Sequence, residues 1–183
     1  MPGPTPSQTV GPFFSMKLRG GNLVAGPKIE GERIRIVGQV FDGERALIED
    51  ALIELWQANA IGRYSTGGRA SGFTGFGRAE TDFSTGEYWF ETIKPGRVPD
   101  PEGECQAPHL TLVVQARGML RPVFTRLYFA DEAEANESDL VMRMVPADRR
   151  QTLVADLVDE SGPKIYRFDI KFQGDDETVF FAF

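Results

Sequence analysis

Apolar and polar residues alternate along much of this chain. Between Arg33 and Val40 the apolar side chains fall mostly at every second position, and Asp42-Gly43 follows as a turn signal. A period of two is typical of a β-strand with one buried face, because successive side chains point to opposite faces. Strongly apolar or alternating patterns predict further strands at residues 51–57, 87–93, 109–117, 123–129, 165–172 and 178–183.

Helical signals are short by comparison. Residues 131–136 predict one or two helical turns, with acidic side chains at the start, where they favour the helix dipole. Residues 147–154 predict another short helix, and the glycine-rich stretch 62–77 predicts a long loop. Short strands separated by glycine-rich turns indicate an all-β fold, an antiparallel β-sandwich with long loops and a few short helices.

The beginning of the chain lacks periodicity and is rich in glycine and proline. We therefore predict that residues 1–32 form an extended arm and loop, and that residues 33–183 form one domain. Simple disorder is the alternative for the arm. The adjacent Phe13 and Phe14 favour docking against a neighbouring subunit, because two exposed phenylalanines are unfavourable in water.

Charge and composition narrow the partners. The formal net charge is −7, with 20 basic and 27 acidic residues, which argues against nucleic acid or an anionic membrane as the main partner. No apolar run approaches the roughly 20 residues that span a bilayer, and the N-terminus lacks a secretory signal pattern. The single cysteine, Cys105, excludes an internal disulfide and suits the cytoplasm, which is the expected location.

The only histidine, His109, lies in the stretch Ala107-Pro108-His109-Leu110-Thr111. On a β-strand the residues i and i+2 share a face, so a His-x-His pair there can bind one metal ion with two imidazoles. Here Thr111 takes the place of the second histidine. We expect this chain to bind no metal, with His109 a partly buried, hydrogen-bonded remnant of such a pair.

Several segments resemble the intradiol ring-cleaving dioxygenases. They are residues 5–14, 54–59, 92–96, 107–109, 125–129, 166–170 and 177–181, and the resemblance runs from about Thr5 to Phe183. It implies a β-sandwich core and, in active chains, one non-haem ferric iron held by two tyrosines and two histidines. Phenolate oxygens are hard ligands that stabilise Fe(III), while imidazoles complete a site that is open to substrate.

The resemblance also locates the ligand positions in this sequence. His109 stands at the first histidine position and Thr111 at the second, while Val98 stands where active chains carry a tyrosine. The loop 65–76, which would carry the other tyrosine, contains none, and Gln106 replaces an arginine. Three of the four ligands are therefore predicted to be lost.

The implied role is that of an α-type chain in a hetero-oligomer. The resemblance implies an iron-bearing β chain that binds Fe(III) and uses O₂ to cleave protocatechuate between its hydroxylated carbons, giving 3-carboxy-cis,cis-muconate. It also implies that the substrate lies near the interface and that this chain lines part of the pocket, through Thr9, Gly11, Pro12 and Arg117. A guanidinium suits the ring carboxylate of such a substrate, which is very unfavourable to bury unpaired.

Two alternatives to this interpretation remain open. One is a purely structural scaffold or binding subunit with no substrate contact, in which Arg117 is a solvated arginine at a strand end. The other is a self-sufficient dioxygenase with an unusual iron site, which the lost tyrosine and histidine positions argue against. Arg121 and Arg126 are weaker substrate candidates, which we expect to pair with acids on neighbouring strands or across the interface.

Overall fold

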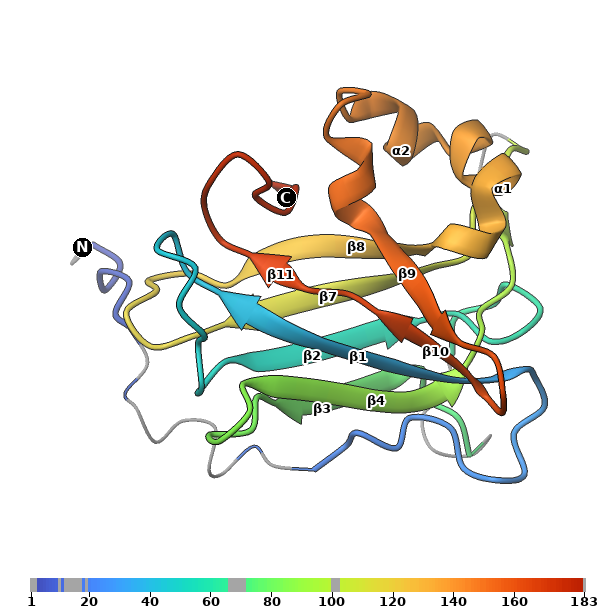
Figure 1. Cartoon of the computed structure of the whole chain (residues 1–183), viewed down its shortest axis with the longest axis horizontal. Helices are drawn as coiled ribbons and strands as arrows, with labels where there is room; N and C mark the ends of the chain where they lie inside the picture. The colour runs from blue at the N-terminus through green and yellow to red at the C-terminus, as the bar shows by residue number, and fades with distance from the viewer. Residues whose placement is uncertain are drawn as a thin grey trace.

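The computed structural model describes residues 3–9, 11, 18, 20–65, 72–99 and 103–182 (Figure 1). The strands are β1 (Arg33–Phe41), β2 (Leu52–Gln57), β3 (Phe76–Glu80), β4 (Glu87–Ile93), β5 (Val98–Pro99), β6 (Cys105–Gln106), β7 (His109–Gln115), β8 (Val123–Phe129), β9 (Val154–Asp159), β10 (Lys164–Arg167) and β11 (Ile170–Lys171). The helices are α1 (Ala133–Ser138) and α2 (Leu140–Met144), with 3₁₀ turns at Ala130–Glu132 and Arg150–Leu153.

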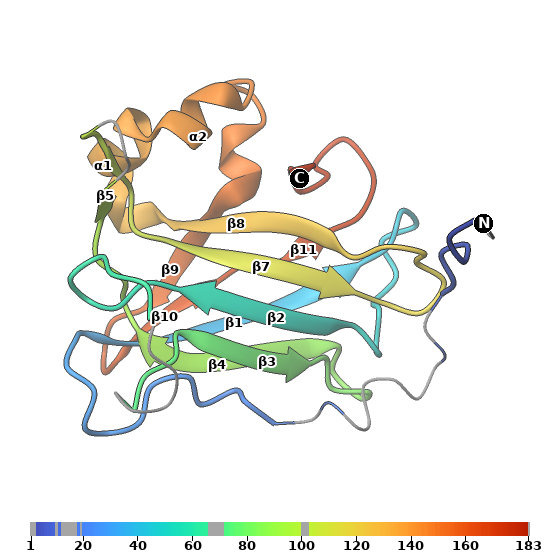
Figure 2. The same ribbon diagram turned by 180° about the vertical axis from the view of Figure 1, so that it is seen from behind.

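One mixed sheet makes up most of the fold. Its strands follow the order β11-β1-β10-β9-β8-β7-β2-β3, and β4 pairs with the other edge of β1. β3, at one end of this path, lies against β4, so the sheet is nearly closed. β1 and β10 face the viewer in Figure 1, whereas β2, β3 and β7 face the viewer in Figure 2, with the core between the two sides.

The all-β prediction with few short helices is confirmed, but the purely antiparallel arrangement is not. The pairs β1–β4, β2–β3, β2–β7, β7–β8 and β9–β10 are antiparallel. The pairs β1–β10, β1–β11 and β8–β9 are parallel. Between β8 and β9 the chain passes through α1 and α2, and a connection of this length permits parallel pairing.

The strongest sequence patterns correspond to the strands that build the core. In β1, alternate side chains are buried, including Ile34, Ile36 and Val40. The predicted helix at 147–154 was wrong, because the chain forms only a 3₁₀ turn there before β9 begins. The predicted strand at 165–172 is divided into β10 and β11. In place of the strand predicted at 178–183, the described residues of this segment form an isolated β-bridge between Phe181 and Phe124.

The segment before β1 is held against the edge of the sheet. The Val24 amide donates to the Glu91 carbonyl at 2.9 Å, and the Glu91 amide donates to the Asn22 carbonyl at 2.9 Å. Arg33 donates from Nη1 to the Ala25 carbonyl at 2.6 Å. These contacts explain how a stretch without periodicity is ordered alongside β4.

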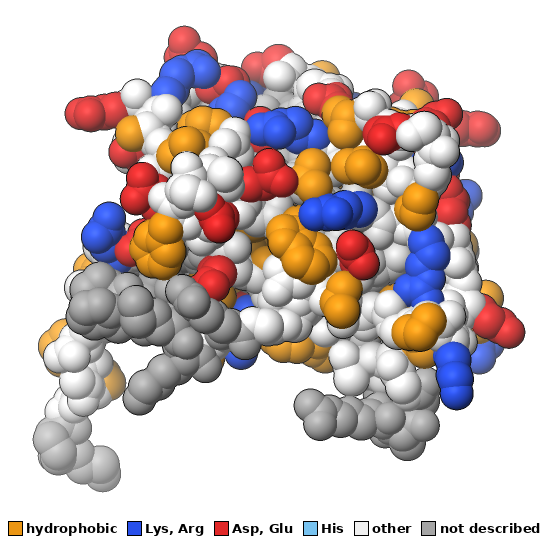
Figure 3. Space-filling view, turned by 60° about the horizontal axis from the view of Figure 1, so that its bottom comes forward, with side chains coloured by type: hydrophobic (Ala, Val, Ile, Leu, Met, Phe, Trp, Pro, Cys, Tyr) orange, Lys and Arg blue, Asp and Glu red, His pale blue; other side chains and the backbone are white. Residues whose placement is uncertain are grey.

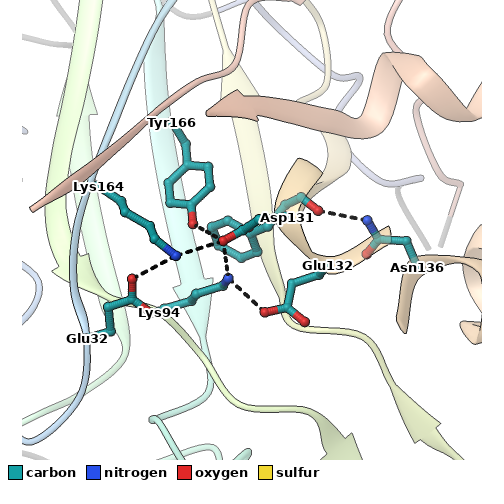
Figure 4. A network of polar contacts seen from close by, with 8 residues as sticks. Glu32, Lys94, Asp131, Glu132, Asn136, Lys164 and Tyr166 are labelled. Atoms are coloured by element: carbon teal, nitrogen blue, oxygen red, sulfur yellow. Dashed lines mark hydrogen bonds and ion pairs between the residues drawn. The ribbon is translucent and has the colours of Figure 1, made fainter. Parts of the chain in front are cut away.

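A network of charged groups lies beside the start of the helical segment (Figure 4). The Asp131 carboxylate accepts hydrogen bonds from Lys94 Nζ at 2.9 Å, Lys164 Nζ at 3.0 Å and the Tyr166 hydroxyl at 2.9 Å. Lys164 also pairs with Glu32 at 3.1 Å. The network therefore links four segments that are distant in sequence: the residue before β1, the end of β4, β10 and the turn after β8.

Candidate functional site

The N-terminal arm contacts the turn that follows β7. The Gly118 amide donates a hydrogen bond to Thr9 Oγ1 at 2.8 Å. Both ribbon views show the N-terminal segment beside the loop between β7 and β8. The structure thus brings together Thr9 and the Arg117-Gly118 turn, two of the regions that the sequence nominates for substrate binding. Gly11 is exposed, and Pro12 lies outside the described residues.

The local sequence explains why the chain turns directly after Arg117. Gly118 has a φ of +86°, in the left-handed region that glycine adopts without strain. The Met119 amide donates to the Ala116 carbonyl at 3.3 Å and closes the turn. Arg117 is consequently displayed at the end of a rigid strand, with 63% of its side chain exposed.

Arg117 is not simply solvated, because it forms an ion pair with a buried acid. Its Nε lies 3.0 Å from Asp50 Oδ2, and the Asp50 side chain is 3% exposed. The pairing of Leu52 with Gln115 in β2 and β7 explains this contact. Continuing that antiparallel register by two residues places position 50 opposite position 117. Asp50 was not among the residues predicted from the sequence, although this register is the signal that identifies it.

His109 lies at the other end of β7 and is 1% exposed. Its Nδ1 is 2.8 Å from the Ala107 carbonyl, and its Nε2 is 3.2 Å from the Tyr64 hydroxyl. A carbonyl only accepts, so Nδ1 donates and Nε2 accepts from Tyr64. Burial, and then the positive charge of Arg126, lower the pKa of His109 to about 4, against the opposing effect of the Ala107 hydrogen bond. The imidazole is therefore neutral at pH 7, with both nitrogens hydrogen-bonded.

Arg126 lies close to this histidine, but its partners differ from those expected. Its Nη1 donates to Gln106 Oε1 at 3.0 Å and approaches the Tyr128 hydroxyl at 3.3 Å. Neither group is an acid, so these hydrogen bonds are not the expected pairing with an acid on a neighbouring strand, and pairing across the interface stays a prediction. Tyr128 in turn donates to the buried Asp139 at 3.0 Å. Desolvation by burial raises the pKa of Tyr128, so its hydroxyl keeps its proton as a donor.

The donors around His109 do not match the ferric site that the resemblance implies. Thr111 shares a face of β7 with His109, and Val98 pairs with Gln106 in the short β5–β6 ribbon. Neither offers a phenolate or an imidazole. The phenols near His109 are Tyr64, which is hydrogen-bonded to it, and Tyr128, which packs against its ring and donates to Asp139. Among the residues that the structure describes, no group of three or more His, Cys, Asp or Glu side chains is placed to hold a metal ion. That the iron site is lost in this chain stays a prediction.

Arg117 and His109 are too far apart to belong to one site. His109 is the first residue of β7, and Arg117 lies just beyond its last residue, eight positions further along the chain. At the rise of an extended strand this separation is about 26 Å, far more than a single aromatic ring spans. Any ligand that Arg117 binds is therefore remote from the His109 region of the same chain.

The surface agrees with the charge argument made from composition. On the face shown in Figure 3, basic, acidic and apolar side chains are interspersed, and no continuous basic track is visible. None of the helices in the described ranges has the length and apolar character needed to cross a bilayer.

Comparisons with known proteins define the class. The family model described as "Dioxygenase" matches residues 21–174. The dioxygenase domain of a carbohydrate-binding fusion protein from Streptomyces sp. SirexAA-E superposes with a TM-score of 0.65 at 26% identity, covering 92% of this chain and 97% of that one. Catechol 1,2-dioxygenase from Acinetobacter radioresistens shares the fold, with a TM-score of 0.67 at 22% identity, covering 81% of this chain and 55% of that one. This chain belongs to the intradiol ring-cleaving dioxygenase family, which confirms the resemblance found in the sequence.

Within that family, the similarity is strong to one type of subunit. The chain is 45% identical to the protocatechuate 3,4-dioxygenase alpha chain of Burkholderia cepacia, covering 97% of this chain and 96% of the relative. The Pseudomonas putida alpha chain is 40% identical, with coverage of 98% and 96%. The beta chain of the Burkholderia cepacia enzyme is 30% identical, with coverage of 86% and 71%.

Proposed function

We propose that this chain is the α subunit of a protocatechuate 3,4-dioxygenase. It pairs with an iron-bearing β chain, on which protocatechuate and O₂ react to give 3-carboxy-cis,cis-muconate. Residues 33–183 form one intradiol-type β-sandwich domain, and residues 1–32 form the arm. The lone Cys105 accords with a cytoplasmic location. The near full-length similarity to two alpha chains supports this assignment, since it exceeds the similarity to a beta chain.

The observation that carries the proposal is the position of Arg117. Along the strand it lies about 26 Å from the His109 region, so it does not contribute to a site there. Its side chain is exposed at the tip of a turn, next to Thr9 of the arm. A cation displayed in this way fits a pocket that is completed by a second chain. Arg117, Thr9, Gly11 and Pro12 are the residues that we assign to the substrate pocket of the β chain.

The chemistry of the substrate fits this arrangement. Protocatechuate carries a ring carboxylate remote from the two hydroxyls that bind iron. A guanidinium forms charge-assisted hydrogen bonds with a planar carboxylate and can do so with two nitrogens at once. The Fe(III) itself belongs to the β chain, because His109 is the single histidine of this chain, and Val98 and Thr111 stand at two of the expected ligand positions.

The test is kinetic and uses the complex of this chain with its β chain. Replacing Arg117 with alanine should raise KM for protocatechuate by about tenfold, the loss of one charge-assisted interaction. Arg143→Ala is the control, since Arg143 is an exposed arginine on α2 with no proposed substrate contact, and it should change KM by less than about twofold. Unchanged kinetics in Arg117→Ala would instead support a scaffold that does not contact the substrate.

A further inference from the structure

We propose that Asp50 is a positioning residue that orients the Arg117 guanidinium toward the carboxylate of the substrate. The inference rests on the proposed function, in which Arg117 contacts that carboxylate. The two side chains differ sharply in environment: Asp50 is 3% exposed and Arg117 is 63% exposed. The acid therefore lies behind the arginine, on the side away from solvent.

The contact uses the inner part of the guanidinium. The ion pair joins Asp50 Oδ2 to Arg117 Nε at 3.0 Å. Within the described ranges, no other ion pair or hydrogen bond involves the Arg117 guanidinium. The two terminal nitrogens of the planar fork are thus available for a second, external carboxylate. Pairing at Nε restricts rotation of the side chain and so favours bidentate binding by the terminal nitrogens.

The environment of Asp50 is unusual for a buried acid. Asp139, which is also buried, accepts hydrogen bonds from the amides of Ala107 and Met142 and from the Tyr128 hydroxyl. In Asp50, by contrast, Oδ1 has no hydrogen-bond partner among the described residues. A carboxylate that is desolvated with so few partners is unfavourable for stability, and a mostly exposed arginine compensates little. A role in orienting Arg117 explains why an acid occupies this position.

The backbone gives Asp50 a firm base. The next residue, Ala51, donates its amide to Thr81 Oγ1 at 2.9 Å, and the Thr81 amide donates to the Ala51 carbonyl at 3.0 Å. Arg117, in contrast, lies in a turn that leads to Gly118. A flexible side chain on a turn is held by a buried carboxylate just before β2, which is the kind of support that fixes a binding residue in a productive geometry.

The experiment uses the assembled complex with its β chain and four versions of this chain: wild type, Asp50→Asn, Arg117→Ala and the double variant. For each, we would measure kcat and KM for protocatechuate, and the inhibition constant of catechol, which lacks the carboxylate. Asp50→Asn should raise KM about 3- to 10-fold with kcat within about twofold, because orientation of the carboxylate is lost while the chemistry is not. The inhibition constant of catechol should not change.

The double variant tests whether Asp50 acts through Arg117 or independently of it. If Asp50 acts through Arg117, Asp50→Asn has no further effect on KM in the Arg117→Ala background. A rise in KM for Arg117→Ala, with an unchanged or lowered KM for Asp50→Asn, would overturn the positioning role and leave the proposed function standing. Unchanged KM in Arg117→Ala would overturn the proposed substrate contact itself. An equal loss of protocatechuate and catechol binding in Asp50→Asn would show a merely structural role.

Discussion

Replacing Lys94 with methionine should destabilise the fold by about 2 kcal/mol, because it removes a largely buried cation from the charged network in Figure 4. The Lys94 side chain is only 10% exposed, and its Nζ lies 2.9 Å from Asp131 Oδ2 and 2.7 Å from Glu132 Oε1. The same Nζ lies 5.3 Å from the centre of the Phe129 ring. Methionine keeps most of the packing volume, so the change isolates the charge.

The magnitude follows from the pKa of Asp131. Desolvation raises this pKa, but hydrogen bonds from Lys94, Lys164 and Tyr166 outweigh it and lower the pKa from 3.8 to about 2. That pKa shift corresponds to roughly 2.5 kcal/mol of stabilisation. Lys94 supplies only part of it, and solvent screens part of the interaction, so we assign about 1 kcal/mol to the contact between Lys94 and Asp131. The loss of the cation–π contact with Phe129 and of the Glu132 ion pair adds about 1 kcal/mol.

The assay is urea unfolding of the purified chain at fixed protein concentration, followed by circular dichroism. At pH 7 the midpoint of thermal unfolding should also fall by about 4–8 °C for this length of chain. Because the pKa of Asp131 is lowered, its contribution is fully present above about pH 4 and is lost as the pH falls toward about 2. The difference between wild type and Lys94→Met should therefore narrow over that range.

Lys28→Met is the matched control, since Lys28 is exposed and makes no ion pair or hydrogen bond within the described part of the chain. It should change the free energy of unfolding by less than about 0.5 kcal/mol. Equal stabilities of Lys94→Met and Lys28→Met would refute the argument, as would a difference from wild type that stays constant down to pH 3.

Three further predictions follow from single positions. The only histidine, His109, should titrate near 4 in an NMR experiment, and titration near 6.5 would contradict its burial. The free energy of unfolding should also fall as the pH drops from about 6.5 to about 4, because in that range only the unfolded chain's histidine takes up a proton. Asp139→Ala should lower the free energy of unfolding by about 3 kcal/mol or more, since three buried hydrogen-bond donors lose their acceptor. A loss below about 1 kcal/mol would contradict the importance of these three hydrogen bonds. Gly38→Ala should prevent stable folding, because a Cβ there would lie 1.9 Å from the Phe168 carbonyl oxygen, whereas Gly162→Ala, with open space around it, should fold normally in the same melting assay.

The sequence predicted those strands whose buried face is made of large side chains. β1 follows from alternation and β4 from its aromatic residues, because large side chains on one face of a strand must point into the core. β3 was missed because its buried positions are Gly77 and Ala79, which give no apolar period. Gly77 is small for a structural reason, since a Cβ there would lie 2.5 Å from Val24 Cγ2.

The parallel strand pairings and the strand β9 could not be predicted from the local sequence, for a different reason. Only Ala155 is fully buried in β9, and the strand forms because the helical segment returns the chain to the edge of β8. In the candidate site, the residue types of Arg117 and Thr9 were sufficient to nominate them. Their proximity, and the buried partner Asp50, depend on the register of β2 against β7, which no single segment encodes.

The central claim is that this chain completes a dioxygenase without holding the iron. The most direct test measures iron content and protocatechuate-dependent O₂ uptake, first for the purified chain and then for the chain produced together with its β chain. We predict neither stoichiometric iron nor O₂ uptake for the chain by itself, and both for the complex. Stoichiometric iron with activity in the isolated chain would contradict the account, because Tyr64 and His109 would then belong to a working iron site.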